Sequence, residues 1–268
     1  MSRKYLAGPY ALWALAFVLI PLCMIVYYGM TTADGSITLA NLTAISQPEH
    51  IKALWLAVGL SVVSTIICLL LGYPLAMILA STGMGRGAFV VLVFILPMWM
   101  NFLLRTLAWQ TLLEKNGVIN SVLGILGLPE LAIINTGWAI ILGMVYNFLP
   151  FMVLPIHTSL SKIDINVTNA ARDLGANPLQ VFWRVTLPLS IPGVISGITM
   201  VFIPALTTFV ISNLLGGSKI LLIGNVIEQE FTQTGNWNLG SGLSMILMIF
   251  IIISMIVSFV CETEESVM

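Results

Sequence analysis

The sequence predicts an all-α polytopic membrane protein with six transmembrane helices. Of its 268 residues, 59% are hydrophobic and only 8% are charged, whereas a soluble domain usually carries about 25% charged residues. So few charges cannot cover a water-exposed surface, so most of the chain must face lipid or other buried helices. Six apolar runs are long enough to cross the hydrocarbon core, which takes about 20 residues: approximately Tyr10–Met30, Ala53–Ala80, Ala88–Thr106, Trp138–Leu160, Ile191–Leu214 and Gly240–Val260.

The first run follows Arg3 and Lys4, a pattern that a signal peptide would also show. The run is longer than a usual signal core, and no small-x-small cleavage site follows it. We therefore interpret it as the first membrane helix. The second and third runs are joined by a tight turn, Ser81–Gly87.

The segment 161–190 predicts a helix–turn–helix that does not cross the membrane. Asp164 is a plausible N-cap of the first helix, and Gly175 is the residue type that ends a helix in the left-handed conformation. Asn177 and Pro178 begin a second helix, which we expect to stop before Pro188. This helix also presents two aromatic residues that need a partner or the lipid interface to cover them: Phe182 and Trp183.

Lys and Arg placement predicts that both termini are cytoplasmic. With the N-terminus inside, the cytoplasmic side holds six basic residues, namely Arg3, Lys4, Arg86, Lys162, Arg172 and Arg184. The opposite side holds four, namely Lys52, Lys115, Lys219 and Arg105, the last near the outer end of the third run.

A spaced motif within segment 161–190 carries the functional information. It reads Asn169-Ala170-Ala171, three residues, Gly175, nine residues, then Val185-x-Leu187-Pro188. It resembles the EAA loop of binding-protein-dependent ABC importer permeases, whose pattern is Glu-Ala-Ala-x3-Gly-x9-Ile-x-Leu-Pro. Every spacing agrees. Asn169 stands where Glu is usual, which keeps a hydrogen-bonding side chain without the charge, and Val185 replaces Ile.

The resemblance implies a type I importer permease fold, with residues 1–268 as a single permease domain and 161–190 as its coupling loop. In the family this loop docks in a groove of an ATP-binding subunit. The residues expected to carry this coupling are Asn169, Ala170, Ala171, Asp173, Gly175, Leu187 and Pro188. Small alanines let a partner approach the helix closely, and glycine permits the left-handed turn.

Several further segments resemble spermidine/putrescine permeases. They include Leu96-Pro97-Met98-Trp99, Asn116–Asn120, Tyr146–Ile156, Phe202–Ala205, Leu214–Gly217, Ile223-Gly224-Asn225 and Gln229-Glu230-Phe231. Permeases for iron, sulfate and other solutes share this scaffold, so another solute stays an alternative. The resemblance implies a second homologous permease, two copies of an ATPase and an extracytoplasmic solute-binding protein in a bacterial cytoplasmic membrane. The chain lacks G-x4-G-K-[ST], so we expect ATP and Mg²⁺ to bind to the partner ATPase, with no cofactor in this chain.

Polar and aromatic residues in or beside the apolar runs are candidates for the substrate path: Trp99, Arg105, Trp109, Tyr146, Asn147 and Thr208. Trp rings offer cation–π faces to an ammonium group, but Trp109 also suits an interfacial aromatic belt. Arg105 has two functional interpretations, anchoring the solute-binding protein or gating the path, and one structural alternative, in which it extends its charge to the interface. Tyr146 and Asn147 precede two prolines, which free backbone carbonyls.

Other functional classes fit less well. An ion-coupled secondary transporter places ionisable groups at mid-membrane, and no acid lies clearly inside a predicted span. A membrane-embedded enzyme would need a Ser/His pair or an H-E-x-x-H helix, and the chain has only His50 and His157. Its three cysteines show no metal-ligand spacing, and no basic cluster is present to bind nucleic acid.

Overall fold

The computed structural model describes residues 8–81, 96–217 and 219–265, and these form helices joined by loops. Within these residues, five helices are long and apolar enough to cross a membrane: Leu12–Gly29, Pro48–Ser81, Gly137–Leu160, Pro178–Thr207 and Trp237–Val260. They correspond to the first, second, fourth, fifth and sixth predicted runs. The prediction of an all-α polytopic membrane protein is thus confirmed.

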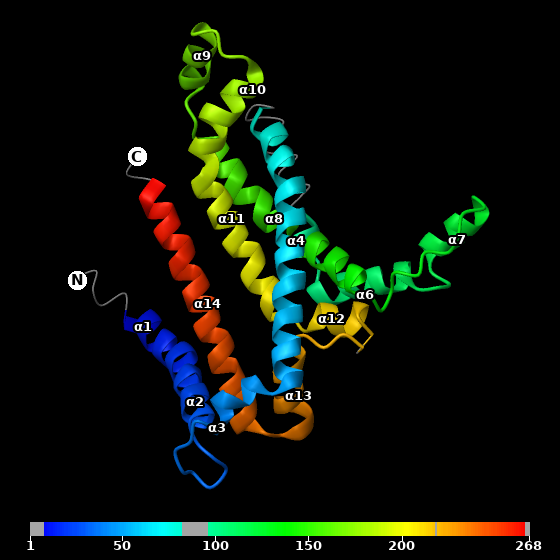
Figure 1. The fold of residues 1–268 in the computed structure, drawn as a ribbon, viewed down its shortest axis with the longest axis vertical. Coiled ribbons are helices and arrows are strands. Elements are labelled where there is room, and N and C mark those ends of the chain that lie inside the picture. Colours follow the sequence, from blue (N-terminus) through cyan, green and yellow to red (C-terminus); the bar gives the residue numbers. More distant parts are fainter. Residues whose placement is uncertain (1–7, 82–95, 218, 266–268) are drawn as a thin grey trace.

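The elements fall into three groups (Figure 1). Long helices form the bundle: α1 (Gly8–Ala14), η2 (Leu15–Leu19), α2 (Ile20–Gly29), α4 (Pro48–Ser81), α8 (Gly137–Leu160), α11 (Leu187–Thr207) and α14 (Trp237–Glu265). One end carries α9 (Ile165–Asp173), α10 (Pro178–Val181) and η5 (Phe182–Thr186). Shorter elements lie toward the other end or beside the bundle: α3 (Ala40–Thr43), η3 (Ala44–Ser46), η4 (Leu96–Trp99), α6 (Phe102–Leu113), α7 (Val118–Ile125), α12 (Val210–Leu215), α13 (Ile223–Gln229) and η6 (Glu230–Thr234). We call these two ends the α9 end and the α13 end.

The third predicted run, Ala88–Thr106, is not one continuous helix. Its first eight residues lie outside the described residues. In the remainder, the short turn η4 ends at Trp99 and α6 begins at Phe102. Asn101 separates them because its side-chain Oδ1 accepts hydrogen bonds from the backbone N–H groups of Leu103 and Leu104, at 2.9 and 3.3 Å. A residue that caps a helix start cannot also continue the preceding helix.

The core forms where α4, α8 and α11 pack together, and glycines set the spacing of α8 and α11. A Cβ on Gly193 would lie 2.5 Å from the Cβ of Ser159, and one on Gly197 would lie 2.8 Å from the sulfur of Met152. The two glycines are four residues apart and so share one face of α11. Small residues at this spacing let membrane helices approach closely, which gains dispersion contacts where lipid offers no hydrophobic driving force.

The fifth span begins earlier than the sequence predicts. The second hairpin helix does not stop before Pro188: α10, η5 and α11 follow one another without a gap from Pro178 to Thr207. Proline lacks an N–H and its ring crowds the carbonyl four residues before it. The π-helical turn η5 lies directly ahead of Pro188 and widens the backbone there, so the helix accommodates the ring.

The same span ends earlier than predicted, so the continuous run Ile191–Leu214 is wrong beyond Thr207. Thr208 is extended (φ −67°, ψ 135°), and α12 starts two residues later. The break is held by the fully buried side chain of Asn225. Its Oδ1 accepts from Ser212 Oγ at 2.6 Å and from the backbone N–H of Leu222 at 3.0 Å. Its Nδ2 donates to the backbone oxygen of Phe209 and to Asn213 Oδ1, at 3.1 and 2.7 Å.

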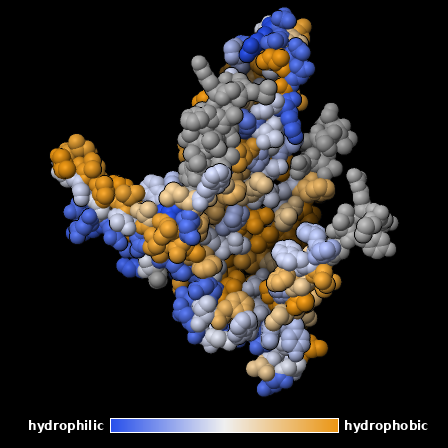
Figure 2. All heavy atoms as spheres, turned by 180° about the vertical axis from the view of Figure 1, so that it is seen from behind, coloured by the Kyte–Doolittle hydropathy of each residue, from blue (hydrophilic) through white to orange (hydrophobic). Residues whose placement is uncertain are grey.

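Helix α7 projects sideways from the bundle (Figure 1). Asn120 closes the loop that follows it, since its Oδ1 accepts from the backbone N–H of Leu131 at 2.7 Å. The tip of this arm is hydrophobic and exposed, with Ile125 86% accessible (Figure 2).

Candidate functional site

The hairpin at the α9 end begins with a well-capped helix. Asp164 accepts a hydrogen bond from the backbone N–H of Asn166 at 2.9 Å. At the other end Gly175 adopts φ +86°. Its N–H donates to the carbonyl of Arg172 at 2.8 Å, and the N–H of Ala176 donates to the carbonyl of Ala171 at 3.1 Å. These two bonds define a Schellman motif, which satisfies the last carbonyls of α9 and reverses the chain.

The second arm starts with a reciprocal capping box. Asn177 Oδ1 accepts from the backbone N–H of Gln180 at 2.8 Å, and Gln180 Oε1 accepts from the backbone N–H of Asn177 at 2.9 Å. This arm then continues into the fifth span. The second arm of the hairpin and the fifth span thus form one continuous helix that reaches the core.

The hairpin is anchored to α4 by Phe182, which the sequence indicated as needing a partner, and by Tyr73 and Ser190, which it did not single out. The rings of Phe182 and Tyr73 meet edge to face at 5.8 Å. The Tyr73 hydroxyl forms a buried 2.7 Å hydrogen bond with Ser190 Oγ, and Ser190 Oγ also donates to the carbonyl of Leu187 at 2.9 Å. A tyrosine inside an otherwise apolar run was the available signal, because a buried phenol needs a partner.

The outer surface of the hairpin is open to a partner. Among the predicted coupling residues, Asn169, Ala170 and Asp173 are exposed and Ala171 is half-buried. Large apolar side chains lie uncovered beside them, with Leu174 90% and Leu179 66% accessible. Figure 2 shows hydrophobic spots among the hydrophilic side chains that gather at this tip. Of the other predicted coupling residues, Gly175 forms the turn of the hairpin, and Leu187 and Pro188 begin α11, which continues from it.

Three predicted path residues lie together between α6 and α8. The rings of Trp109 and Tyr146 are 5.2 Å apart and nearly perpendicular. The guanidinium carbon of Arg105 lies 5.8 Å from the centre of the Tyr146 ring. Arg105 is only 8% exposed, which does not fit a side chain that extends its charge to the membrane surface.

The other predicted path residues lie apart from this cluster. Asn147 is fully buried: its Nδ2 donates to the carbonyl of Gly143 at 2.8 Å, while its Oδ1 has no partner among the described residues. Thr208 is buried at the break between α11 and α12. The Trp99 side chain is 77% exposed. The structure thus brings together three of the six predicted path residues, namely Arg105, Trp109 and Tyr146.

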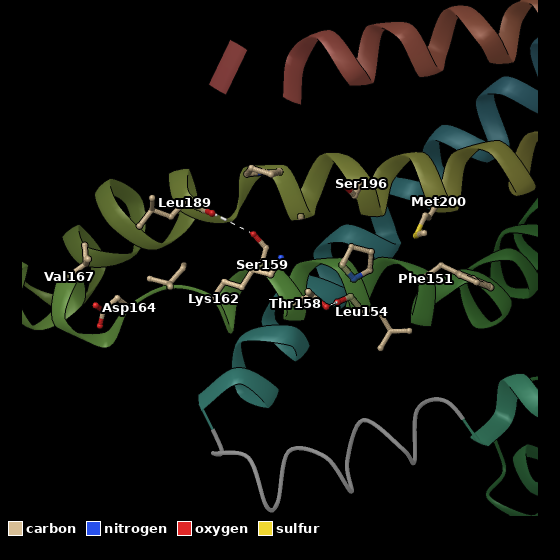
Figure 3. Close-up of a pocket in the computed structure, with 14 residues that line it drawn as sticks. Phe151, Leu154, Thr158, Ser159, Lys162, Asp164, Val167, Leu189, Ser196 and Met200 are labelled. Carbon is tan, nitrogen blue, oxygen red and sulfur yellow. Dashed lines mark hydrogen bonds between the residues drawn. The ribbon is translucent and has the colours of Figure 1, made fainter. Parts of the chain in front are cut away.

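A groove of about 900 Å³ runs between α8 and α11 toward the α9 end. Figure 3 shows Phe151 and Met200 at its far end, and Lys162 and Asp164 beside α9. Pro155 also lines it, and proline leaves the carbonyl four residues earlier without its usual N–H donor. The groove therefore combines apolar walls with polar backbone and a charged mouth.

Comparison with known proteins gives a consistent picture. The model of the family "binding-protein-dependent transport system inner membrane component" matches residues 6–261. The spermidine/putrescine transport system permease protein PotB of Haemophilus influenzae is 40% identical over 254 residues, covering 89% of this chain and 88% of that protein. PotB of Escherichia coli K12 is 37% identical over 245 residues, covering 88% and 89%.

Solved structures match over nearly the whole fold. A chain of a bacterial ABC transporter involved in import of the acidic polysaccharide alginate superposes with a TM-score of 0.83 at 16% identity, covering 97% of this chain and 94% of that one. A chain of the MetNI methionine ABC transporter superposes with a TM-score of 0.59 at 19% identity, covering 82% and 99%. At these identities the likeness concerns the fold alone.

Proposed function

Because the chain belongs to the family of binding-protein-dependent transport system inner membrane components, we propose that it is the permease subunit of an ATP-driven importer of spermidine and putrescine. The observation that carries the substrate class is the 40% identity to a spermidine/putrescine permease over most of both chains. The alginate and methionine transporters share the fold at less than 20% identity and so do not favour their own solutes.

The hairpin of α9 and α10 is the proposed coupling element. Its spacing matches the EAA loop, its turn is fixed by the left-handed Gly175, and its apolar surface lies exposed. An ATPase groove that covers Leu174 and Leu179 would bury surface that water otherwise contacts. Because α10 continues into α11, closure of the ATPase pair would move the fifth span.

The path is proposed to run along α8. Trp109 offers an aromatic ring to an ammonium group, and Tyr146, which packs edge to face against it, also contacts the Arg105 guanidinium. The Oδ1 of Asn147, which has no partner among the described residues, is an acceptor one turn before Phe151. Phe151 in turn lines the groove toward the α9 end. A second homologous permease is proposed to complete the path.

The remaining partners are two copies of an ATPase, which would bind ATP and Mg²⁺, and an extracytoplasmic binding protein that delivers the substrate. One solved relative is described as in complex with a substrate-bound periplasmic protein. With the basic residues distributed as above, the α9 end is proposed to be cytoplasmic. Reporter fusions at Asp34, Gly117 and Thr234 should be extracytoplasmic, and a fusion at Asp173 cytoplasmic. A cytoplasmic Gly117 would contradict this orientation.

The decisive experiment reconstitutes the chain with its partner permease, ATPase and binding protein in proteoliposomes. Putrescine or spermidine should stimulate ATP hydrolysis and accumulate inside, whereas iron, sulfate and alginate oligomers should not. Stimulation by one of those solutes in place of polyamines would reject the substrate class and leave the permease assignment intact.

A further inference from the structure

A cavity of about 450 Å³ lies at the α13 end, between the break of α11, helix α13 and helix α14. It is separate from the groove beside α9 and from the cluster around Tyr146. Its size falls within the range of about 300–1,000 Å³ that small-molecule sites occupy. Figure 1 shows α13 beside the first turns of α14, opposite the hairpin.

One carboxylate lines this cavity, that of Glu228. The side chain is half-buried, and Thr232 Oγ1 donates to its Oε1 at 3.0 Å, which fixes its direction. Within the described part of the chain, the one ion pair joins Lys115 to Glu130. Glu228 therefore has no basic partner there, although a half-buried carboxylate is stabilised by one.

Three hydroxyls line the same cavity, and each donates its proton within the chain. Thr207 donates to the carbonyl of Ile203 at 3.1 Å and Ser244 to the carbonyl of Gly240 at 2.8 Å. Thr232 shares its proton between the carbonyl and Oε1 of Glu228, at 2.7 and 3.0 Å. A hydroxyl in this state keeps its lone pairs and acts as an acceptor. The polar groups of the cavity thus accept hydrogen bonds and carry negative charge.

The remaining walls are apolar. Phe209 and Phe231 contribute rings, and α13 and α14 contribute aliphatic side chains. A ring face attracts an organic cation, and aliphatic walls suit methylene groups. No group of three or more metal-binding side chains occurs within the described ranges 8–81, 96–217 and 219–265. One carboxylate, acceptor hydroxyls and aromatic walls together match an alkylammonium, whose three N–H groups only donate.

We infer that this cavity binds one ammonium group of a linear polyamine, with Glu228 as its counter-ion. The inference rests on the proposed function for the substrate class, and it adds a site that the sequence did not indicate. The cavity touches the Thr207–Phe209 break, where the helix that begins in the hairpin ends. A bound ammonium would therefore contact the end of the helix through which the ATPase is proposed to act.

The chain contains a matched control for Glu228. Two residues further on, Glu230 accepts from Thr234 Oγ1 at 2.8 Å in the same way, is also half-buried, and does not line the cavity. Glu228→Gln and Glu230→Gln each remove one charge and keep an acceptor for the neighbouring threonine. They differ in whether the lost charge faces the cavity.

The test measures equilibrium binding of radiolabelled putrescine to the purified permease–ATPase complex in nanodiscs, without the binding protein. Glu228→Gln should raise the Kd about tenfold, as expected for loss of a charge-assisted hydrogen bond. Glu230→Gln should leave the Kd within about twofold. Glu228→Asp, which keeps the charge on a shorter side chain, should raise the Kd by a smaller factor and serves if the Gln variant fails to assemble.

Three results would overturn the site. The first is no binding by the wild-type complex, and the second is a wild-type Kd in Glu228→Gln, or in Glu228→Asp if the Gln variant fails to assemble. The third is an equal rise of the Kd in Glu228→Gln and Glu230→Gln. The last would indicate a general surface-charge effect. Uptake by the wild-type transporter is measured in parallel. If the wild-type transporter takes up polyamine and Glu228→Gln keeps the wild-type Kd, only this site is rejected. If the wild-type transporter takes up no polyamine, the proposed substrate class is rejected.

Discussion

The turn at Gly175 offers the sharpest test of coupling, through the substitution Gly175→Val. The backbone there has φ +86°, and no atom lies within 4 Å of the position of an added Cβ. The cost of the substitution is therefore conformational and involves no steric clash. A left-handed conformation costs an L-residue about 1–2 kcal/mol, and a β-branched one more. This lowers the population of the intact turn by roughly 5- to 30-fold.

The membrane spans do not depend on this turn, so Gly175→Val should insert and accumulate normally. Docking and transport should fall, because the Schellman bonds of Gly175 and Ala176 no longer hold the two arms in register. The assay is co-purification with the ATPase together with putrescine uptake in the same cells. Gly175→Asn is the control, since Asn tolerates the left-handed region. Normal uptake by Gly175→Val with the ATPase still bound would refute the coupling role.

Three further outcomes are expected. Gly197→Leu should lower the melting temperature of the purified protein, since overpacking a tight helix contact costs about 1–3 kcal/mol. Gly59→Leu, with open space around the added side chain, should leave it unchanged, and equal shifts of the melting temperature would contradict the close approach of α8 and α11. Asn225→Ala should lower the melting temperature of the protein more than Asn213→Ala, because it leaves several buried groups unpaired at about 1–3 kcal/mol each. A smaller effect of Asn225→Ala than of Asn213→Ala would argue against the role of Asn225 at the break. Tyr146→Ala should slow polyamine uptake without reducing assembly, and unchanged uptake would remove it from the path.

Hydrophobicity alone located four spans to within about five residues at each end, because a run of about 20 apolar residues has few alternatives to a membrane helix. The bounds of the fifth span were further off, since Pro178–Thr207 begins and ends well before the predicted Ile191–Leu214. Hydrophobicity failed where polar side chains interrupt helices locally. Asn101 caps α6 within a run that otherwise reads as continuous. The end of α11 depends on Asn225, which lies 17 residues beyond Thr208 and cannot be paired with it from sequence.

The candidate site likewise has parts that the sequence predicts and parts that it does not. The hairpin was predictable because its caps and its glycine act over a few residues, and the structure has both where expected. The anchor between Tyr73 and Ser190 joins residues 117 positions apart, and the cavity around Glu228 collects side chains from several elements. Such contacts depend on tertiary packing, which periodicity and motif spacing do not encode.

The continuous helix Pro178–Thr207 is long enough to act as a lever if the hairpin moves it as one body. Its 30 residues span about 45 Å at 1.5 Å per residue, whereas the hydrocarbon core is about 30 Å thick. Its contact with α8 at Gly193 and Gly197 is a natural fulcrum, which leaves arms of about 25 Å toward Pro178 and about 18 Å toward Thr207. A tilt of roughly 10° about that point would carry the two ends about 4 Å and 3 Å in opposite directions. A modest rotation imposed at the hairpin would thus displace the far end by about the width of a methylene chain.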